Sequence, residues 1–356
     1  MHMHTRSSLP NKIALKKISI RNYKAIDSLE LDFPEMLMQD EPNVCVLGSK
    51  NGVGKTSLLE CITLVVLAAY GELEEKVTDV DFIRAGASSS TIQGDFLVNN
   101  EIKLVKVTLN TKGKVMVEGL IKNLPEATRR IHSVGEVMGM TPEPVGAHGV
   151  FFIHGYRKIQ EGRIELGRIV GENDSLRMRR TRFAPIRWQD QTLSTFKTSI
   201  LEWQLNRANL LDYSTSKRMN NDANALQILG ELLEKYAGVK LGKIRPYGDG
   251  TMSILVVDKD NDDVVFPIDG LSSGQKEIIS TLFMIWENTR NKSTIVLIDE
   301  PELHLNAQWH KSFIADLMYY APNNQYVIAT HSEQIMDSVA YENRVMLHNN
   351  KKIISL

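Results

Sequence analysis

Several protein classes can be set aside because the sequence lacks what they need. Only two cysteines, Cys45 and Cys61, occur among its 356 residues. Both stand in apolar runs, so they predict buried, reduced thiols in a cytoplasmic protein and not a disulfide framework. No apolar run approaches the roughly 18 residues that span a bilayer, so we expect no membrane partner. Residues 1–12 are polar, lack the apolar centre of a secretion signal, and predict a flexible tail.

Charge and size leave a large globular fold open. The net charge is −1, with 24% charged residues. No global basicity therefore indicates nucleic acid, and any nucleic-acid surface must be local. With 42% hydrophobic residues, the chain can build one large core or two lobes.

A glycine-rich turn at residues 48–56 follows the apolar run Val44–Leu47 and precedes a helical pattern. Glycines let successive backbone N–H groups curl around an anion, and the next helix points its partial positive end at the same anion. This order predicts a phosphate-binding loop, although Ser49 stands where the strict pattern has glycine. The expected nucleotide contacts are Asn51, Gly52, Gly54, Lys55, Thr56 and Ser57. Lys55 would reach the β- and γ-phosphates and Thr56 would ligate Mg²⁺; the alternative is a turn that holds nothing.

Two further predicted strands end in polar side chains. Ile295–Ile298 delivers Asp299 and Glu300 to its carboxyl end, where unpaired carboxylates are costly without a cation. We therefore expect Asp299 to hold Mg²⁺ and Glu300 to position and deprotonate the attacking water. Tyr326–Thr330 ends at His331, which we expect to donate to the γ-phosphate and to sense its loss.

A polar turn of four residues opens the apolar helical pattern Ile278–Trp286. Its members are Ser272, Ser273, Gly274 and Gln275. Hydroxyl and N–H groups at a helix start can bind an anion, and the same residues can simply cap the helix. The turn alone does not separate the two interpretations.

Hydrophobic periodicity predicts the remaining elements. Ile13–Phe33 is expected to form two strands around a turn at Arg21–Lys24, which is either a solvated tip or a basic contact to phosphate. Thr192–Tyr236 predicts two helices joined by the polar segment 214–224. The further expected strands are 92–98 and 102–109 around a turn at 99–100, 115–120, 149–153, 254–257 and 264–266, with a terminal hairpin of 344–347 and 352–356.

Two charged segments have competing interpretations. An arginine-rich stretch contains Arg163, Arg168, Arg177, Arg179, Arg180, Arg182 and Arg187. It is either a solvated loop or a contact for a phosphate backbone or an acidic partner. The acidic residues 258–263 fit an ordinary hairpin turn better than a metal-dependent nuclease site, because no companion carboxylate stands on a preceding strand.

Taken in order, these motifs resemble those of the ABC-type ATPases of the RecF, SMC and OLD group over almost the whole chain. Asn22–Lys24 is similar to the family's opening hairpin, and Lys55 with Thr56 matches its Walker A residues. The further matches are Leu271–Gln275 with the signature motif, Asp299–Leu305 with the Walker B segment and Thr330–Ser332 with the switch histidine.

The resemblance implies an α/β fold, a P-loop NTPase of the ABC-ATPase head type with a mixed central sheet, an antiparallel β lobe and a short helical insertion. The implied domains are ATPase lobe I at 13–188, the helical insertion at 189–240 and lobe II at 241–356. In this family two heads sandwich two ATP molecules, and each signature motif caps the nucleotide of the other head. A homodimer or higher oligomer is therefore implied, with ATP and Mg²⁺ as cofactors and with Ser273 and Gly274 acting across the dimer.

One departure from the family follows the predicted strand 149–153. The family has a glutamine there that contacts Mg²⁺, whereas this chain reads His154-Gly155. Gln160 or a water would take its place.

With Tyr156 and Arg157 after the predicted strand 149–153, the chain is similar to a bacterial subgroup of stand-alone ATPases. Members of that subgroup accompany nucleases or other effectors in antiphage systems such as Septu and certain retrons. Unlike OLD proteins, the chain is expected to have no room for a Toprim nuclease after His331.

The leading hypothesis is an ATPase that closes around ATP and controls a separately encoded effector, a nuclease, with nucleic acid as a candidate signal. A RecF-like DNA-repair ATPase and a slow-turnover ATP-binding scaffold are the alternatives. A transporter's nucleotide domain is disfavoured because Leu303–Leu305 does not match that branch.

Overall fold

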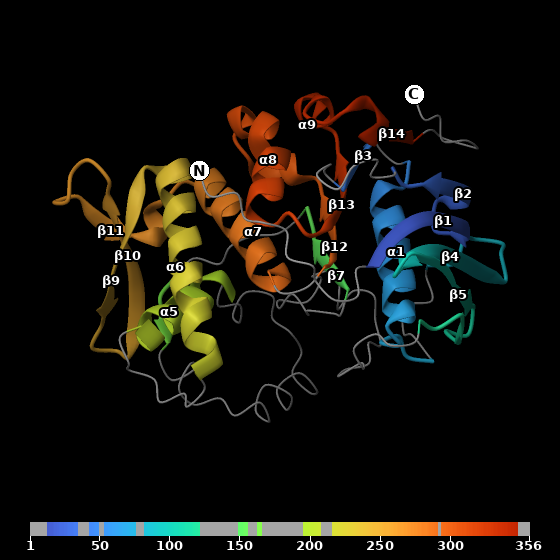
Figure 1. Ribbon diagram of the computed structural model, residues 1–356, viewed down its shortest axis with the longest axis horizontal. Coiled ribbons are helices and arrows are strands. Elements are labelled where there is room, and N and C mark those ends of the chain that lie inside the picture. Colours follow the sequence, from blue (N-terminus) through green and yellow to red (C-terminus); the bar gives the residue numbers. More distant parts are fainter. Residues whose placement is uncertain are drawn as a thin grey trace. The chain divides into compact units, whose positions relative to one another are not determined.

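The computed structural model describes residues 13–34, 43–49, 53–75, 82–121, 149–155, 162–165, 195–207, 216–290 and 293–347. Two structural units divide the chain: residues 1–157 with 288–356 form the first, and residues 158–287 form the second. Figure 1 shows the elements of each unit. The predicted tail at 1–12 lies outside the described residues, and the lobe boundaries predicted at residues 188 and 240 stay a prediction.

A five-stranded parallel sheet in the order β14-β3-β13-β12-β7 forms the centre of the first unit. Its strands are β3 (Val44–Ser49), β7 (Val150–Ile153), β12 (Ile295–Asp299), β13 (Gln325–Thr330) and β14 (Arg344–Leu347). Strands β7, β12 and β13 are buried throughout, which is why they occur in the sequence as continuous apolar runs. The register pairs Asp299 with Ala329 and Thr330 with Gly48, so the carboxyl ends of β12, β13 and β3 meet at one edge of the sheet.

Helix α1 (Lys55–Ala69) follows the glycine-rich turn and packs between this sheet and an antiparallel sheet of the same unit (Figure 1). Its side chains are buried nearly all round, as expected for a core helix. The same apolar cluster contains Val327 of β13 and Val107 of β5 (Glu101–Asn110). The two sheets therefore fix α1, and with it the polar residues at its N-terminus.

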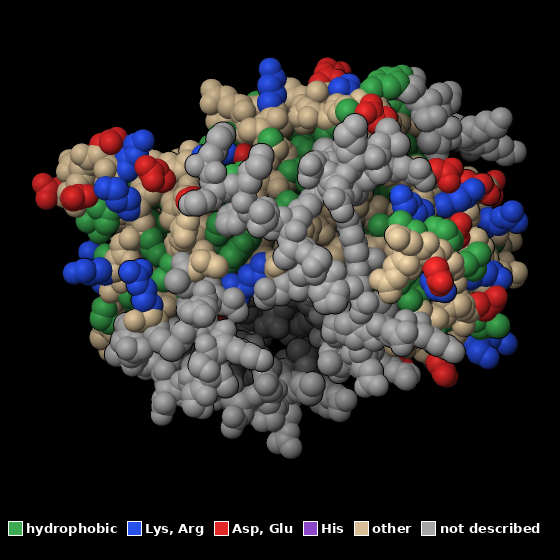
Figure 2. Space-filling model, viewed as in Figure 1, with side chains coloured by type: hydrophobic (Ala, Val, Ile, Leu, Met, Phe, Trp, Pro, Cys, Tyr) green, Lys and Arg blue, Asp and Glu red, His purple; other side chains and the backbone are tan. Residues whose placement is uncertain are grey.

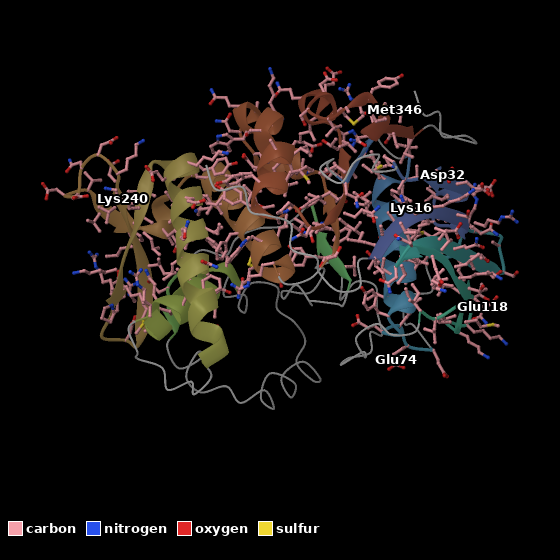
Figure 3. The ribbon with its side chains drawn as sticks, viewed as in Figure 1. Lys16, Asp32, Glu74, Glu118, Lys240 and Met346 are labelled. Carbon is pink, nitrogen blue, oxygen red and sulfur yellow. The ribbon has the colours of Figure 1, made fainter. Side chains whose placement is uncertain are left out.

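The antiparallel sheet has the order β2-β1-β4-β5-β6. Besides β5, its strands are β1 (Ile13–Tyr23), β2 (Ile26–Asp32), β4 (Ser89–Val98) and β6 (Val115–Glu118). The hairpin turn at Asn99 and Asn100 is confirmed, with φ of 50° and 67°. Figure 3 labels Glu118 of β6 on this sheet. Lys106 Nζ lies 3.2 Å from Glu118 Oε1, so opposite charges face each other across β5 and β6.

The predicted turn at Arg21–Lys24 is wrong in its position. Arg21 to Tyr23 continue β1, and Lys24 with Ala25 makes the turn. Tyr23 is buried and its ring stacks on that of Phe82, with centroids 5.6 Å apart, so burial of this ring extends the strand. Lys24 Nζ donates to the buried carboxylate of Glu60 over 2.6 Å, which gives this basic side chain a partner inside the protein.

The side chain of Gln325 joins the two sheets of the first unit. Its amide oxygen accepts from the N–H of Leu15 over 2.8 Å, and its amide nitrogen donates to the carbonyl of Leu15 over 2.8 Å. Both contacts are buried, so they are exchanged with little competition from water. The first residue of β13 is thereby fastened to β1.

The C-terminal part of the first unit is helical between its strands. The elements are η2 (Pro301–His304), α8 (Ala307–Tyr320), α9 (Glu333–Asp337) and η3 (Tyr341–Asn343). Tyr326 Oη donates to the carbonyl of Ala321 over 2.7 Å at the end of α8. The strand predicted at 344–347 is confirmed as β14, which pairs in parallel with β3. Its predicted hairpin partner, 352–356, lies outside the described residues, so the terminal hairpin stays a prediction.

The second unit combines helices with a small antiparallel sheet in which β8 and β9 both pair with β10. Its elements are β8 (Ile164–Glu165), α5 (Thr195–Arg207), α6 (Ser216–Ala237), β9 (Val239–Pro246), β10 (Thr251–Asp258), β11 (Val265–Pro267), η1 (Ile268–Gly270) and α7 (Ser273–Thr289). The polar connection predicted at 214–224 is wrong, because α6 already begins at Ser216. This segment contains no glycine or proline, so its sequence is compatible with a helix.

The apolar stripes predicted in the helical region pack in the core of this unit. Phe283 of α7 contacts Phe196 and Trp203 of α5 edge-on, with ring centroids 5.6 Å and 5.2 Å apart. Leu229, Leu232 and Leu233 of α6 are fully buried. None of the helices in the described ranges is long and apolar enough to cross a lipid bilayer.

Candidate functional site

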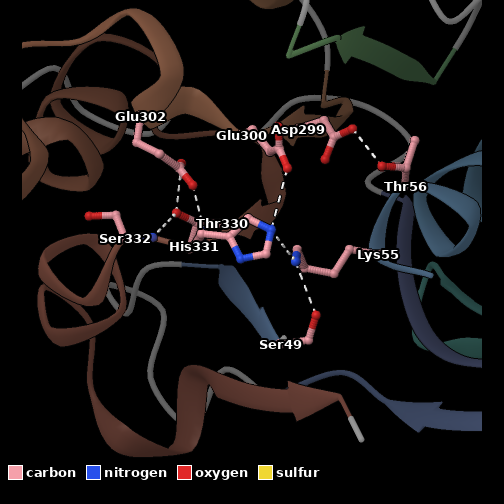
Figure 4. A network of polar contacts seen from close by, with 9 residues as sticks. All are labelled: Ser49, Lys55, Thr56, Asp299, Glu300, Glu302, Thr330, His331 and Ser332. Atoms are coloured by element: carbon pink, nitrogen blue, oxygen red, sulfur yellow. Dashed lines mark hydrogen bonds and ion pairs between the residues drawn. The ribbon is translucent and has the colours of Figure 1, made fainter. Parts of the chain in front are cut away.

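Polar side chains from three neighbouring strands and one helix meet at the carboxyl edge of the parallel sheet (Figure 4). We call this group the strand-end cluster: Ser49, Lys55, Thr56, Asp299, Glu300 and His331. Thr56 Oγ1 donates to Asp299 Oδ2 over 2.8 Å, although 243 residues separate them in sequence. The acidic pair therefore lies directly beside the start of α1, as the sequence predicts.

Gly54 shapes the start of α1. Its backbone is left-handed, with φ 96°, and an added Cβ would lie 3.3 Å from the side chain of Ile26. Its carbonyl accepts the N–H of Leu58 over 2.9 Å, so the helix begins here. Ser57 is buried in the first turn. Asn51 and Gly52, both predicted to contact nucleotide, lie outside the described residues.

Lys55 is held between two polar partners. Its Nζ donates to Ser49 Oγ over 3.0 Å and to His331 Nε2 over 2.8 Å. The residue is 7% exposed, and burial lowers the pKa of its ammonium because the charged form is desolvated. Neither contact supplies a formal negative charge, and the nearby carboxylates of Asp299, Glu300 and Glu302 only partly offset the effect of burial. In the sequence Ser49 is only a departure from the glycine pattern of a phosphate-binding loop, and its contact with Lys55 was not predicted.

Asp299 is a buried carboxylate with an unused oxygen. Burial raises its pKa to about 6, while the hydrogen bond from Thr56 acts in the opposite direction. Its Oδ1 is buried and has no hydrogen-bond partner among the described residues. Such an oxygen is normally compensated by a donor or a cation. Two hard oxygen ligands, from Asp299 and Thr56, are thus available to a metal ion.

Glu300 leaves β12 in a strained backbone conformation. Its φ is 45°, in the left-handed region that residues other than glycine rarely adopt. Its N–H donates to the carbonyl of Ala329 over 2.8 Å, and its Oε1 lies 3.4 Å from His331 Nε2. Nε2 accepts from Lys55 only when it carries no proton, and it donates to Glu300 only when it carries one, in the neutral Nε2–H tautomer or in the imidazolium. His331 can therefore change partners within the cluster.

The predicted signature residues belong to the second unit and are described there. Ser272 and Gln275 form a reciprocal cap: the N–H of Ser272 donates to Gln275 Oε1 over 2.9 Å, and the N–H of Gln275 donates to Ser272 Oγ over 3.3 Å. Gln275 Nε2 also donates to the carbonyl of Tyr236 over 3.3 Å. Ser273 is exposed and Gly274 half-buried at the first turn of α7. A nucleotide contact from any of the four stays a prediction.

An ion pair between a buried lysine and a half-buried aspartate supports this turn. Lys197 of α5 pairs with Asp269 and also donates to the carbonyl of Gly162 over 3.1 Å. Lys276 Nζ donates to the backbone carbonyl of Asp269 over 3.0 Å. These contacts connect α5, η1 and the first turn of α7, so the position of Ser273 depends on the helical segment.

Gly155 occupies the region where the related ATPases have a glutamine. A Cβ at this position would lie 3.3 Å from the carbonyl oxygen of Asp299 and 3.3 Å from Glu300 Cβ. The chain therefore passes close behind the acidic pair. Gln160, the predicted substitute, and the pair Tyr156 and Arg157 lie outside the described residues.

The two charged segments have different outcomes. Of the seven arginines between 163 and 187, only Arg163 is described; it stacks on the ring of Tyr247 at 3.6 Å and pairs with Asp249 at 3.4 Å. Asp258 Oδ1 accepts the N–H groups of Asp260 and Asn261, which is an ordinary turn. Within the described part of the chain, no three His, Cys, Asp or Glu side chains are grouped as a metal centre. On the face seen in Figure 2, acidic and basic side chains are interspersed.

Family comparisons identify the group to which this site belongs. An AAA-domain family model matches residues 17–240, more than half of the chain. A second AAA-domain model, whose description also names the AbiEii toxin and a Type IV TA system, matches residues 188–337.

Two groups of curated proteins are similar to this chain. It is 28% identical over 164 residues to the Retron Ec83 probable ATPase of Escherichia coli, which covers 39% of this chain and 30% of that protein. It is 30% identical over 107 residues to the DNA replication and repair protein RecF of Halalkalibacterium halodurans, which covers 30% of this chain and 26% of that protein. The chain spans less than a third of the length of these relatives.

Solved structures show the same fold. The head domain in "Crystal structure of the SmcHead bound to the C-winged helix domain of ScpA" matches with a TM-score of 0.51 at 14% identity, covering 93% of this chain and 94% of that one. The α/β head fold predicted from the sequence is thereby confirmed. With the family match, the conclusion follows that the chain belongs to the AAA-domain family and has the fold of an SMC head domain.

Proposed function

We propose that the chain binds Mg²⁺ and ATP at the strand-end cluster and hydrolyses ATP to ADP and phosphate. The observation that carries this proposal is the 2.8 Å contact between Thr56 and Asp299. It joins the start of a helix that follows a glycine-rich turn to a buried acidic strand end. Phosphate and metal ligands are needed side by side in a phosphoryl-transfer site.

Each side chain of the cluster has a separate task in this proposal. Lys55 exchanges its neutral partners for the β- and γ-phosphates, because charge-assisted hydrogen bonds are the stronger ones. Glu300 takes the proton of the attacking water as general base. His331, released by Lys55, donates to the γ-phosphate and loses that contact when phosphate departs.

The residues present fit Mg²⁺. Asp299 offers a buried, unpartnered oxygen, and the Thr56 hydroxyl lies next to its other oxygen. Mg²⁺ in nucleotide sites is commonly held by one or two protein oxygens together with phosphates and water. When bound, the ion neutralises charge that develops on the phosphate oxygens.

The proposal extends to a dimer and to a separately encoded effector, a nuclease, in antiphage defence. Exposure of Ser273 at the first turn of α7 supports a role in capping nucleotide held by a second copy. Similarity to retron ATPases supports the defence role. Nucleic acid is the candidate signal, and the arginine-rich segment is its candidate contact.

A RecF-like role in DNA repair is the second candidate. Similarity to RecF over 107 residues favours it. DNA-stimulated ATP turnover with a preference for junctions would support repair, whereas stable association with the product of a neighbouring gene would support effector control.

The test is to purify the chain with a tag, with and without co-expression of its neighbouring genes. ATP turnover with Mg²⁺ and ATP-dependent dimerisation by light scattering are measured on the same preparation. We expect turnover, a dimer with ATP, and a co-purifying partner. Turnover no greater than that of the Glu300→Gln variant would contradict hydrolysis and favour the slow-turnover scaffold. Active protein with neither partner nor DNA association would contradict the effector role.

A further inference from the structure

The carboxylate of Glu302 is engaged at both oxygens by the end of β13 (Figure 4). Thr330 Oγ1 donates to its Oε2 over 2.7 Å, and the backbone N–H of His331 donates to its Oε1 over 2.5 Å. The Thr330 hydroxyl also accepts the N–H of Ser332 over 3.0 Å. Hydrogen bonds to an ionised acceptor are about twice as strong as neutral ones. Glu302 therefore fixes the path by which the chain leaves β13.

The turn after β12 brings Glu302 to this position. Glu300 is left-handed, and Pro301 opens the short 3-10 turn η2. Left-handed backbone is unfavourable at a residue other than glycine, so it persists where surrounding contacts hold it. As a result, one histidine faces two carboxylates: Glu300 lies at the imidazole of His331, and Glu302 lies at its backbone.

His331, whose backbone is held by Glu302, is also the residue whose side chain lies between Lys55 and Glu300. His331 Nε2 lies 2.8 Å from Lys55 Nζ and 3.4 Å from Glu300 Oε1. A backbone shift of about 1 Å would take Nε2 out of hydrogen-bond range, and misplacements of that size lower catalytic rates strongly.

The charge of Glu302 argues against a role in nucleotide affinity. Its carboxylate is close enough to Lys55 to stabilise the protonated ammonium. A third negative charge beside Asp299 and Glu300 weakens the attraction for phosphate. A neutral residue at position 302 would therefore bind an anionic nucleotide more tightly, so the carboxylate is explained better by the geometry that it imposes.

We propose that Glu302 is a positioning residue, which holds the backbone of His331 so that the imidazole stays between Lys55 and Glu300. The proposal rests on the ATPase function proposed above. Glu302 acts through His331, so the proposal predicts an effect on kcat that is separate from nucleotide binding.

The test uses three variants of the full chain and one control. Glu302→Ala removes both contacts, Glu302→Gln removes the charge but keeps the accepting oxygen, and Thr330→Val removes one contact. The control is Glu342→Gln, which removes an exposed carboxylate of η3. The measurements are kcat, KM for Mg²⁺–ATP and the melting temperature.

We expect Glu302→Ala to lower kcat at least tenfold while KM stays within threefold of the wild-type value. Glu302→Gln should keep at least a third of wild-type kcat, and Glu342→Gln should equal wild type. Thr330→Val should lower kcat about threefold or more, and the double variant Glu302→Ala/Thr330→Val should lose less than the product of the two single effects, because the two residues share one interaction.

Three results would overturn the proposal. Equal kcat loss in Glu302→Ala and Glu302→Gln would mean that charge and not position matters. Loss of kcat together with a higher KM and a lower melting temperature would mean a general structural role. Wild-type kcat in Thr330→Val would overturn it even if Glu302→Ala did not fold. A wild-type chain without turnover would instead remove the ATPase proposal itself, and this one with it.

Discussion

Two helices of this chain start from polar turns of similar composition, and their polar groups are satisfied in different ways. At α1 the residue before the helix is Gly54, which has no side chain to cap it, and Lys55 and Thr56 reach segments more than 240 residues away. At α7 the cap is reciprocal between Ser272 and Gln275. The first turn depends on distant groups or a ligand, whereas the second is complete within four residues.

The comparison shows why similar composition need not mean similar chemistry. A helix start without a side-chain cap leaves N–H groups for an anion. A capped start has used part of that capacity, so only its exposed members remain for a partner. The strand-end cluster should therefore dominate binding and chemistry, and the turn at α7 should matter only when two copies meet.

The largest effect is expected from substitution of Glu300, which lies in the strand-end cluster beside the start of α1. Glu300→Gln should retain ATP but lower turnover about 10²- to 10⁴-fold, because the general base is lost while the shape is kept. Single-turnover assays and light scattering measure the two properties, and a stable ATP-bound dimer should accumulate. Glu342→Gln is the charge-matched control, and near-normal turnover in Glu300→Gln would contradict the assignment.

Next in size is the loss of the ammonium. Lys55→Ala should weaken ATP binding about 100-fold or more, since hydrogen bonds to charged groups contribute about 1.5–3 kcal/mol each. Calorimetry with Mg²⁺–ATP measures it. Lys103→Ala, which removes an exposed lysine of β5 that pairs with Glu101, should bind as wild type. Equal ATP affinity of the Lys55 and Lys103 variants would contradict the expectation that the start of α1 dominates ATP binding.

Removing the unpartnered carboxylate should have opposite effects on stability and on function. The raised pKa of Asp299, about 6 against 3.8, means that the folded state disfavours its charged form. The penalty is present above pH 6 and disappears as the pH falls towards 4, and it amounts to about 3 kcal/mol. Asp299→Asn should therefore stabilise the nucleotide-free protein at pH 7 by about that amount and lose Mg²⁺-dependent ATP binding.

Denaturant unfolding at pH 7 and pH 4.5 checks the sign of this effect. The difference between Asp299→Asn and wild type should shrink at the lower pH, because the native carboxyl group then carries its proton. A variant that is less stable than wild type at pH 7 would show that Asp299 is compensated without a cation.

The smallest expected effect separates the second turn from the first. Ser273→Arg should leave ATP affinity within about threefold and lower turnover and dimer formation about tenfold, because a bulky charge obstructs only a contact between copies. Asp260→Arg, in the exposed turn between β10 and β11, is the matched control. Loss of ATP affinity in Ser273→Arg would mean that both turns serve one site within the same chain.

Elements with a strong local pattern could be predicted from the sequence. The buried strands at 295–298 and 326–330 and the hairpin at Asn99–Asn100 follow from apolar runs and from residues that tolerate positive φ. The turn near Lys24 was misplaced because polarity at Arg21 and Asn22 suggested a turn, whereas burial of Tyr23 extends the strand.

Partners within the site could not be predicted, because they depend on strand order. The sequence indicates that β12 and β13 end in polar residues, but not that the two are neighbours. The contacts of His331 with Glu302 and with Lys55 exist only because β13 lies between β12 and β3. The signal for Glu302 was a third acid two residues after Glu300, and nothing in its spacing indicates which backbone it reaches.

Gln325 gives this sheet a mechanical property. Its amide grips both backbone groups of Leu15, while the opposite end of the same strand carries His331. Strand β13 is six residues long and buried throughout, so it is stiff. We therefore expect a displacement of His331 to be transmitted along β13 to β1. Departure of phosphate from one edge should thus be felt in the antiparallel sheet, and a spectroscopic label at the tip of its β4–β5 hairpin would register each turnover.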